Sequence, residues 1–395
     1  MNQNHFFLTR EKELVPVEII HATPFKRQIK FLEGAQVGVT KNIHPEGVAW
    51  GTMYPRVFSV IKKPEHVFVH KGRALVQSHP ETTSAAIPTE EAYRFQPFLA
   101  DVIDSIHANE NILLTGGTGV GKTTHILQMA ARIKQPVLRI NFNGETRMSD
   151  LIGKVSVING ETHWTDGVLP KAMRNGYWLL LDELDFADPA VLSLLHPVLE
   201  EDSQLVLKEN GGEIIRPHAN FRVFATANSI GAMEDRAGAY DGTNRMNEAF
   251  LDRWQVILVN NLPEKEEIAV VRSKVKGLTN VMAKRIVQFA NKVRNQDFQN
   301  GFQFSGDNFS TRKVLAWATK SALHRNAIKG AQLAWLDKMT KDDQSVVLQL
   351  LHTHFGGMKR SRSHNRIKVL TMGTKVSATK RRGRPPKVSL MKTGT

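Results

Sequence analysis

The sequence predicts an α/β protein in which a parallel sheet carries helices on both faces, followed by a separate helical region. Three observations predict this fold. Short apolar runs alternate with helix-like segments between residues 111 and 259, a glycine-rich loop follows the first of these runs, and the pattern becomes helical after Pro263. Alternating strands and helices are typical of parallel sheets, because each crossover connection places a helix on one face.

The pattern divides the chain into four regions. Residues 1–85 contain β-like runs such as 57–61 and 67–70, separated by Gly and Pro, and we expect a small β-rich domain there. A linker rich in Pro, Ser and Thr leads to an amphipathic helix from about Pro97 to Asn109. We expect the α/β domain over residues 86–262, a helical domain over 263–355, and a disordered basic tail over 356–395.

The α/β region contains five predicted strands and two predicted hairpins. The apolar runs of the strands cover residues 111–115, 136–142, 177–181, 221–227 and 254–259. Two further stretches, 155–164 and 205–215, have β-like arms around the pairs Asn159-Gly160 and Asn210-Gly211. Asn-Gly favours the positive φ angles of tight turns, so each of these stretches is predicted to be a β-hairpin.

A phosphate-binding loop follows the first strand. Residues 116–123 read Gly-Gly-Thr-Gly-Val-Gly-Lys-Thr, which matches the pattern G-x-x-x-x-G-K-S/T between a strand and a helix. The glycines let backbone amides turn towards phosphates, Lys122 adds a cation, and the Thr123 hydroxyl can hold magnesium. The candidate ATP-binding residues are Gly116, Gly117, Thr118, Gly119, Val120, Gly121, Lys122, Thr123 and Thr124.

Polar residues follow the third and fourth predicted strands. Asp182 is suited to the magnesium shell and Glu183 to polarising the water that attacks the γ-phosphate. The alternative is an acidic helix start, since carboxylates favour that end of a helix. Asn228 would lie near the γ-phosphate and help to place the water, and the alternative is a turn-forming Asn. With the loop, these residues predict Mg2+-dependent ATP hydrolysis.

Composition excludes several kinds of site and separates the tail from the rest. The 395 residues include no cysteine, which excludes disulfides and thiolate metal sites. No apolar run approaches the roughly 20 residues that cross a membrane, and the N-terminus lacks the form of a secretory signal, so we expect a cytoplasmic protein without a membrane partner. After Met358 there are 12 Lys and Arg residues and no acidic residue, which leaves only +3 of the net charge of +15 elsewhere.

The basic tail contains Lys380-Arg-Arg-Gly-Arg-Pro-Pro-Lys, which resembles an AT-hook. In this resemblance Arg382, Gly383, Arg384 and Pro385 lie in the minor groove of A·T-rich DNA, where concentrated negative potential attracts Arg. The flanking basic residues would add salt-dependent phosphate contacts. The alternative is a solvated tail that binds any polyanion through its charge alone.

Taken together, the motifs resemble the AAA+ ATPases of the MoxR-related group, and within it the ATPase subunits of aerobic cobaltochelatase. The resemblance covers residues 87–357. Besides the loop and the acidic pair, it rests on His125-Ile-Leu-Gln-Met-Ala-Ala-Arg, Ser149-Asp-Leu-Ile-Gly-Lys, Gly167-Val-Leu-Pro, Pro197-Val-Leu-Glu, Ile215-Arg-Pro-His, Phe224-Ala-Thr-Ala-Asn, Tyr240-Asp-Gly-Thr and Asn247-Glu-Ala-Phe-Leu-Asp-Arg-Trp. It implies a P-loop AAA+ sheet domain followed by a helical lid, ATP and Mg2+ as cofactors, and a homo-oligomeric ring, which we expect to be a hexamer.

The resemblance also implies roles for single residues. Asn228 takes the role of the first sensor. Arg253 matches the arginine finger, which reaches into a neighbouring subunit's site, and its alternative is a surface ion pair with an acid such as Glu248. Arg312, in the predicted lid, resembles the second sensor, a residue that touches the nucleotide.

The expected function is an ATP-driven motor that remodels a protein partner. For the group, that partner is often a protein with a von Willebrand-type domain or a metal-insertion complex. One alternative is the ATPase subunit of a cobaltochelatase, and another is a DNA-binding scaffold that uses ATP only to assemble. The hairpins correspond to insertions that face a pore or a partner, so His163 and Trp164 are candidate contact residues, unless Trp164 packs against the sheet.

Overall fold

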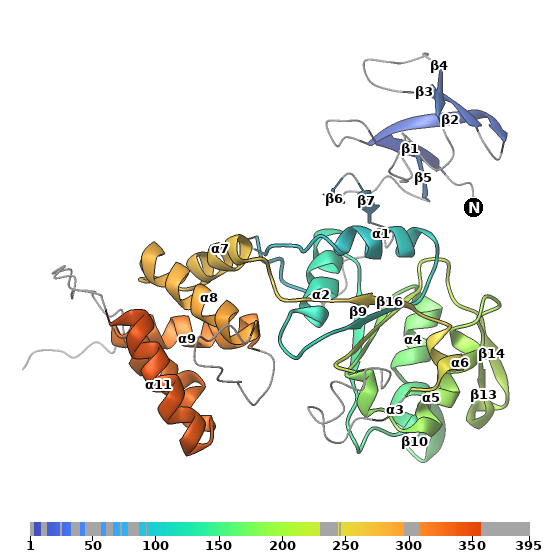
Figure 1. The fold of residues 1–395 in the computed structure, drawn as a ribbon. Helices are drawn as coiled ribbons and strands as arrows, with labels where there is room; N and C mark the ends of the chain where they lie inside the picture. Colours follow the sequence, from blue (N-terminus) through green and yellow to red (C-terminus); the bar gives the residue numbers. More distant parts are fainter. Residues whose placement is uncertain are drawn as a thin grey trace, which may run out of the picture. The chain divides into compact units, whose positions relative to one another are not determined.

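The computed structural model describes residues 4–8, 14–23, 26–32, 40–43, 57–60, 66–71, 73–77, 87–91, 93–229, 244, 246–295 and 309–356. The first five strands form an antiparallel sheet in the order β4-β3-β2-β1-β5 (Figure 1). Their bounds are Asn4–Leu8 for β1, Leu14–Thr23 for β2, Lys26–Phe31 for β3, Thr40–Ile43 for β4 and Val57–Val60 for β5. The described residues of this N-terminal segment are therefore mainly in β-strands.

A second small hairpin precedes the first helix. It consists of β6 Val67–His70 and β7 Arg73–Val76, and it is followed by α1 Leu99–His107. Arg73 donates to Asp104 at 2.7 Å and His107 Nε2 lies 2.7 Å from the carbonyl oxygen of Ala74, so the hairpin is fastened to α1. The helix begins two residues later than predicted, with Pro97 before its N-cap and outside the first turn.

The central sheet has five parallel strands in the order β16-β8-β15-β12-β9. Their bounds are Ile112–Thr115 for β8, Val137–Asn141 for β9, Trp178–Asp182 for β12, Arg222–Ala227 for β15 and Gln255–Leu258 for β16. Each lies within one residue of a predicted run or inside it, which confirms the predicted sheet. Because the strands are parallel, their carboxyl ends share one edge, and the residues that follow them are brought together there.

Helices cover both faces of this sheet. The side chains of β12 pack alternately into two hydrophobic cores, one on each face. Leu179 and Leu181 pack with α3, α4 and α5, whereas Trp178 and Leu180 pack with α1 and α2. The bounds of these helices are Lys122–Arg132 for α2, Met148–Ile152 for α3, Val168–Asn175 for α4 and Pro189–Leu195 for α5. Successive side chains of a strand point to opposite faces, so a strand buried on both faces is apolar throughout.

Both predicted hairpins are present. In the first, β10 Gly153–Ile158 pairs with β11 Glu161–Asp166, and the turn residues Asn159 and Gly160 have φ angles of 54° and 84°. In the second, β13 Leu205–Leu207 pairs with β14 Glu213–Ile215. The second connection is longer than a two-residue turn, because a 3-10 turn at Lys208–Asn210 precedes Gly211.

The helical region follows a short helix, α6 Glu248–Leu251, and strand β16. Its helices are α7 Glu264–Lys274, α8 Asn280–Arg294, α9 Thr311–His324, α10 Ala327–Ala334 and α11 Lys341–Phe355 (Figure 1). Hydroxyl or amide side chains cap the N-termini of α8 to α11, which explains where these helices begin. Among the helices in the described ranges, none combines the length and apolarity that spanning a membrane requires.

A buried ion pair joins three helices of this region. Glu267 on α7 is 0% exposed, and its two oxygens accept from Arg294 of α8 at 2.7 and 2.8 Å. The Thr311 hydroxyl, in the first turn of α9, donates to the same carboxylate at 2.7 Å. Arg294 also donates to the carbonyl oxygen of Phe309 at 2.6 Å. The pair therefore fixes the start of α9 relative to α7 and α8.

Candidate functional site

The glycine-rich loop connects β8 to α2 at the carboxyl edge of the sheet. Gly116 has a φ of 147°, and a Cβ there would lie 2.3 Å from the carbonyl oxygen of Val259, so no larger residue fits. Gly121 has a φ of 104° and caps the N-terminus of α2. Thr118 and Thr124 are exposed, whereas Gly117 and Val120 are buried. The backbone is thus shaped for a loop whose amides face a ligand at a helix N-terminus.

Lys122 lies at the centre of this loop. Its ammonium donates to the carbonyl oxygens of Gly116 at 2.8 Å and Gly117 at 3.1 Å, and to Asn228 Oδ1 at 2.9 Å. The residue is only 8% exposed, and burial lowers the pKa of its amine to about 8. The nearby carboxylates, Asp185 first, act against this shift.

Asp182 ends β12 with both carboxylate oxygens engaged. Its Oδ1 accepts from the hydroxyl of Thr123 at 2.7 Å and from the hydroxyl of Thr226. The Thr226 oxygen itself accepts the backbone N–H of Glu183 at 3.1 Å, so its hydrogen is directed at Asp182. Asp182 Oδ2 is paired with the guanidinium of Arg139.

The oxygens of Thr123 and Asp182 form a donor set that fits a magnesium ion. Magnesium prefers oxygen ligands and is commonly held by one or two protein groups together with substrate phosphates and water. The 2.7 Å distance between Thr123 Oγ1 and Asp182 Oδ1 places both atoms where they could share such an ion. Within the described ranges, no group of three or more His, Asp or Glu side chains is placed to hold a metal by itself.

Glu183 follows Asp182 in a left-handed backbone conformation with a φ of 57°. This conformation is uncommon for a residue other than Gly and turns the chain sharply at the end of β12. The Glu183 carboxylate accepts from Asn141 Nδ2 at 3.2 Å. Asn141 ends the neighbouring strand β9, in register with Asp182.

Asn228 follows β15, between the loop and the acidic residues. Besides accepting from Lys122, its Oδ1 lies 3.4 Å from the Thr118 hydroxyl, which donates to it. Its backbone N–H donates to Asp185 Oδ2 at 3.0 Å, and the N–H of Ser229 donates to the same oxygen at 3.3 Å. Asp185 is fully buried, and burial raises the pKa of its carboxyl group. Its Oδ1 has no hydrogen-bond partner among the described residues.

Arg312 approaches the loop from the first turn of α9. A Cβ built on Gly119 would lie 3.1 Å from the Cβ of Arg312 and 2.6 Å from the hydroxyl oxygen of Ser310, the residue that caps α9. The positive charge of Arg312 also acts to lower the pKa of Lys122. The start of α9 therefore contacts the loop, and Arg312 is exposed beside it.

Arg253 lies away from all of these groups, at the amino edge of the sheet. It comes just before β16, and its carbonyl oxygen accepts from Asn111, the residue before β8, at 3.1 Å. Its guanidinium pairs with Glu200 Oε1 at 2.9 Å and donates to the carbonyl oxygen of Ala249. The predicted alternative partner was Glu248, but the acid that pairs with Arg253 is Glu200.

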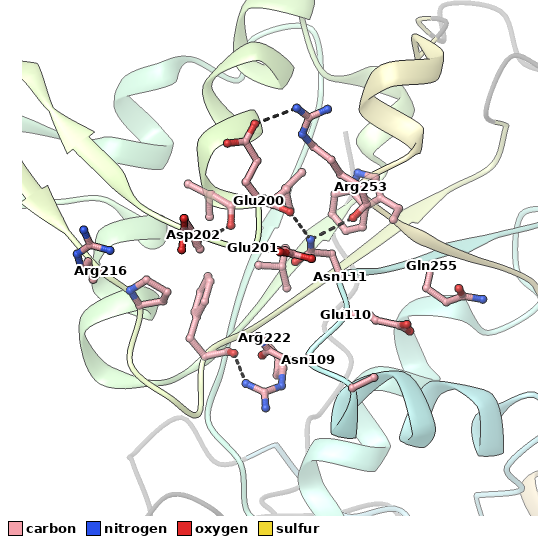
Figure 2. A pocket seen from close by; sticks show the side chains of 18 of the residues that line it. Asn109, Glu110, Asn111, Glu200, Glu201, Asp202, Arg216, Arg222, Arg253 and Gln255 are labelled. Carbon is pink, nitrogen blue, oxygen red and sulfur yellow. Dashed lines mark hydrogen bonds and ion pairs between the residues drawn. The ribbon is translucent and has the colours of Figure 1, made fainter. Parts of the chain in front are cut away.

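Figure 2 shows the polar pocket that contains this ion pair. The pocket is lined by the acidic residues Glu200, Glu201 and Asp202 together with arginines, and both members of the ion pair between Glu200 and Arg253 line it. Arg216 lines the same pocket on the side away from Arg253. The pocket is thus a mixed-charge surface at the edge of the sheet opposite the loop.

The two candidate contact residues of the first hairpin differ in burial. Trp164 is half-buried and packs against the core that contains α3, α4 and α5, and its Nε1 donates to Asp166 at 2.7 Å, which supports the packing alternative. His163 is exposed and lies 3.8 Å from Glu161. The tail residues Arg382, Gly383, Arg384 and Pro385 lie outside the described residues.

Four polar residues of the site were not predicted from the sequence: Arg139, Asn141, Asp185 and Thr226. Arg139 and Asn141 are in the run 136–142, which the apolar pattern marks only as a strand. The two residues are two positions apart near the end of a strand, so their side chains lie on the same face of the sheet. This spacing is the feature of the sequence that could have indicated a polar site beside the acidic strand.

Comparisons with known proteins identify a family model and several relatives that resemble this chain. A family model described as an AAA domain of the dynein-related subfamily matches residues 111–254. The aerobic cobaltochelatase subunit CobS of a Sinorhizobium species is 33% identical over 256 residues, which are 63% of this chain and 76% of that protein. Protein NorQ of Paracoccus denitrificans is 29% identical over 245 residues, 61% of this chain and 84% of that protein. Midasin of Dictyostelium discoideum is 29% identical over 249 residues, which are 62% of this chain but 4% of midasin.

Proposed function

Because this chain belongs to the AAA+ ATPases, in the family that includes the aerobic cobaltochelatase subunit CobS, we propose that it hydrolyses ATP as a ring of identical copies and remodels a protein partner. The proposal assigns the loop 116–124 and Arg312 to ATP, and Thr123 and Asp182 to Mg2+. A Mg2+ ion held by these two residues would supply positive charge that offsets the negative charge of the phosphates. A hexamer is the ring that we expect.

The residues of one copy divide the remaining work. We assign Lys122 to the outer phosphates, for which its ammonium would exchange one or more of the three oxygen acceptors that it has at the loop. Glu183 would polarise the attacking water, and Asn228, one hydrogen bond from Lys122, would orient that water at the γ-phosphate. Among the described residues of one copy, Arg253, the residue that matches the arginine finger, lies away from the loop and pairs with Glu200.

The observation that carries the proposal of a ring is the placement of Arg253. The loop and the acidic pair follow the carboxyl ends of the strands, whereas Arg253 precedes the amino end of β16. Four residues of strand separate these edges, about 13 Å at the usual rise per residue. A side chain at the amino edge is therefore directed away from its own loop. It would instead complete the site of a neighbouring copy in a head-to-tail ring.

Mixing two inactive variants tests this placement. Glu183→Gln should bind ATP without hydrolysing it, and Arg253→Ala should lose about 10³-fold or more in turnover. In an equal mixture, a site is complete when the Arg253→Ala copy supplies Glu183 and its Glu183→Gln neighbour supplies Arg253. Random assembly should therefore restore about a quarter of the wild-type sites.

A matched control is offered by the same pocket. Arg216 also lines it but lies away from Arg253, so Arg216→Ala should retain turnover as a homogeneous ring. If the mixture of Glu183→Gln and Arg253→Ala stays as inactive as its components, although mixed rings form, then Arg253 does not act between copies. Undiminished turnover by Glu183→Gln would contradict its assigned role.

A second candidate function is the ATPase subunit of a cobaltochelatase, which would drive cobalt into a corrin ring. The observation that favours it is the 33% identity to CobS. The test is steady-state ATP hydrolysis with and without the other subunits of such an enzyme. Stimulation by those subunits would support this candidate, and indifference to them would leave the protein partner to be found elsewhere.

The tail adds a proposed tether to A·T-rich DNA, for which the sequence around Arg382-Gly383-Arg384-Pro385 is the support. ATP hydrolysis should be measured with and without A·T-rich duplex DNA, beside a version that ends at Gly357. Stimulation that disappears with the tail would indicate a DNA-coupled motor. Stable rings on ATP with negligible turnover would favour an ATP-assembled DNA-binding scaffold instead.

A further inference from the structure

Asp182 has a positively charged partner of its own. Arg139 lies on β9, the strand that pairs directly with β12, and its guanidinium contacts Asp182 Oδ2. The two side chains differ in exposure, with 4% for Asp182 and 47% for Arg139. A buried carboxylate is therefore neutralised by a cation whose side chain is about half exposed.

This pairing matters because the rest of the Asp182 carboxylate is already in use. Two hydroxyl groups, from Thr123 and Thr226, donate to Oδ1, and Arg139 occupies Oδ2. A buried carboxylate without a counter-charge is strongly unfavourable, so Arg139 stabilises the site while no metal is present. A magnesium ion held by this carboxylate would also supply positive charge at this place.

We propose that Arg139 sets how strongly nucleotide binding depends on magnesium, by acting as the resident counter-ion of Asp182 that yields when the metal enters with ATP. The inference rests on the proposed function and adds a positioning residue to it. Because the Arg139 side chain is half-exposed, its guanidinium can move away from Asp182 without creating a cavity in the core.

Replacing Arg139 should have opposite effects with and without the metal. In Arg139→Gln, Mg2+ no longer competes with a guanidinium, so a nonhydrolysable ATP analogue should bind more tightly in Mg2+. In EDTA the triphosphate meets an uncompensated Asp182, so the same analogue should bind more weakly. The ratio of the two dissociation constants should rise about tenfold, between the effects of exposed and buried ion pairs.

The experiment is an equilibrium titration of the full chain with a fluorescent nonhydrolysable ATP analogue, in Mg2+ and in EDTA. Arg139→Lys, which keeps the charge, should change the ratio less than Arg139→Gln. Arg174→Gln is the matched control, because Arg174 also bridges acidic residues, Asp166 and Glu213, at a different place in the fold. In an Asp182→Asn background, Arg139→Gln should leave the ratio unchanged, since the carboxylate for which the two cations compete is gone.

Two results would overturn the inference. An unchanged ratio in Arg139→Gln, with wild-type protein binding the analogue, would overturn it alone, and equal weakening in Mg2+ and in EDTA is the form of this result that would make Arg139 a simple phosphate contact. Wild-type protein that binds no analogue at all would overturn the proposed function and this inference together. Thermal unfolding of each variant checks that the fold is intact, and Arg139→Lys supplies the comparison if Arg139→Gln does not fold.

Discussion

ATP binding should weaken as the pH rises above about 8, because the amine of Lys122 then loses its proton. Burial lowers the pKa of this amine from the ordinary lysine value of 10.5 to about 8, and Arg312 acts in the same direction. Asp185, Asp182 and Glu183 act against the shift. A triphosphate at the loop would add negative charge beside the amine and raise its pKa again.

The magnitude follows from the two protonation states. With a pKa of about 8, roughly nine-tenths of the free protein carries a charged Lys122 at about pH 7, and roughly one-tenth does at about pH 9. If the charged amine is the form that binds phosphates, the affinity for ATP falls about tenfold over this range, or about 1.4 kcal/mol. The affinity for ATP must fall, and not rise, with increasing pH, because Lys122 holds its proton more tightly in the ATP-bound state than in the free protein. Below about pH 7 Lys122 contributes no pH dependence.

Equilibrium titration with a nonhydrolysable ATP analogue in Mg2+, repeated across this pH range, measures the effect directly. Calorimetry in two buffers with different ionisation enthalpies should show uptake of up to one proton per site at the alkaline end. Lys122→Arg is the control, because a guanidinium stays charged in this range, so its weaker binding should not vary with pH. An affinity for wild-type protein that stays constant from about pH 7 to about pH 9 would refute the reasoning.

Three further predictions concern groups around the site. Asp185→Ala frees two backbone amides after β15 and should lower kcat about tenfold with little change in ATP affinity, whereas Asp185→Asn keeps an acceptor and should retain most activity in the same steady-state assay. Glu267→Leu leaves Arg294 buried without its partner and should lower the free energy of unfolding by about 3–5 kcal/mol in urea denaturation, and an unchanged midpoint would contradict this. Asn141→Ala removes the amide that holds Glu183 and should raise basal ATP turnover about fivefold, and slower turnover would mean that Asn141 positions Glu183 for catalysis.

The sheet and the loop could be predicted because their signals are local. Each strand of the central sheet lies in a mainly apolar run, and the loop 116–123 is one continuous pattern. The hairpin turn at Asn159-Gly160 was equally readable, since both residues adopt the positive φ angles that the pair favours. The order of the N-terminal strands, β4-β3-β2-β1-β5, could not be predicted. In this order β1 pairs with β5, residues 57–60, which is far from β1 in the sequence.

The contacts of the site could not be predicted, because they depend on which strands become neighbours. Arg139 meets Asp182 only because β9 pairs with β12, and Asp185 meets the backbone of Asn228 only because β15 lies on the other side of β12. Strand order in a parallel sheet is not the order of the sequence, so residues about forty positions apart become partners. The partner of Arg253 shows the same limit, since Glu200 is far from it in sequence and Glu248 is near.

The separation of Arg253 from its own loop gives a ring of such copies a sense of direction. A copy joined through Arg253 would control the neighbour on one side and be controlled by the neighbour on the other. A copy that lost Arg253 would keep its own pocket whole and silence the next one. The loss of Arg253 in one copy would therefore affect the neighbour on one side only, and the effect of ATP hydrolysis at one site would be transmitted in one direction around the ring.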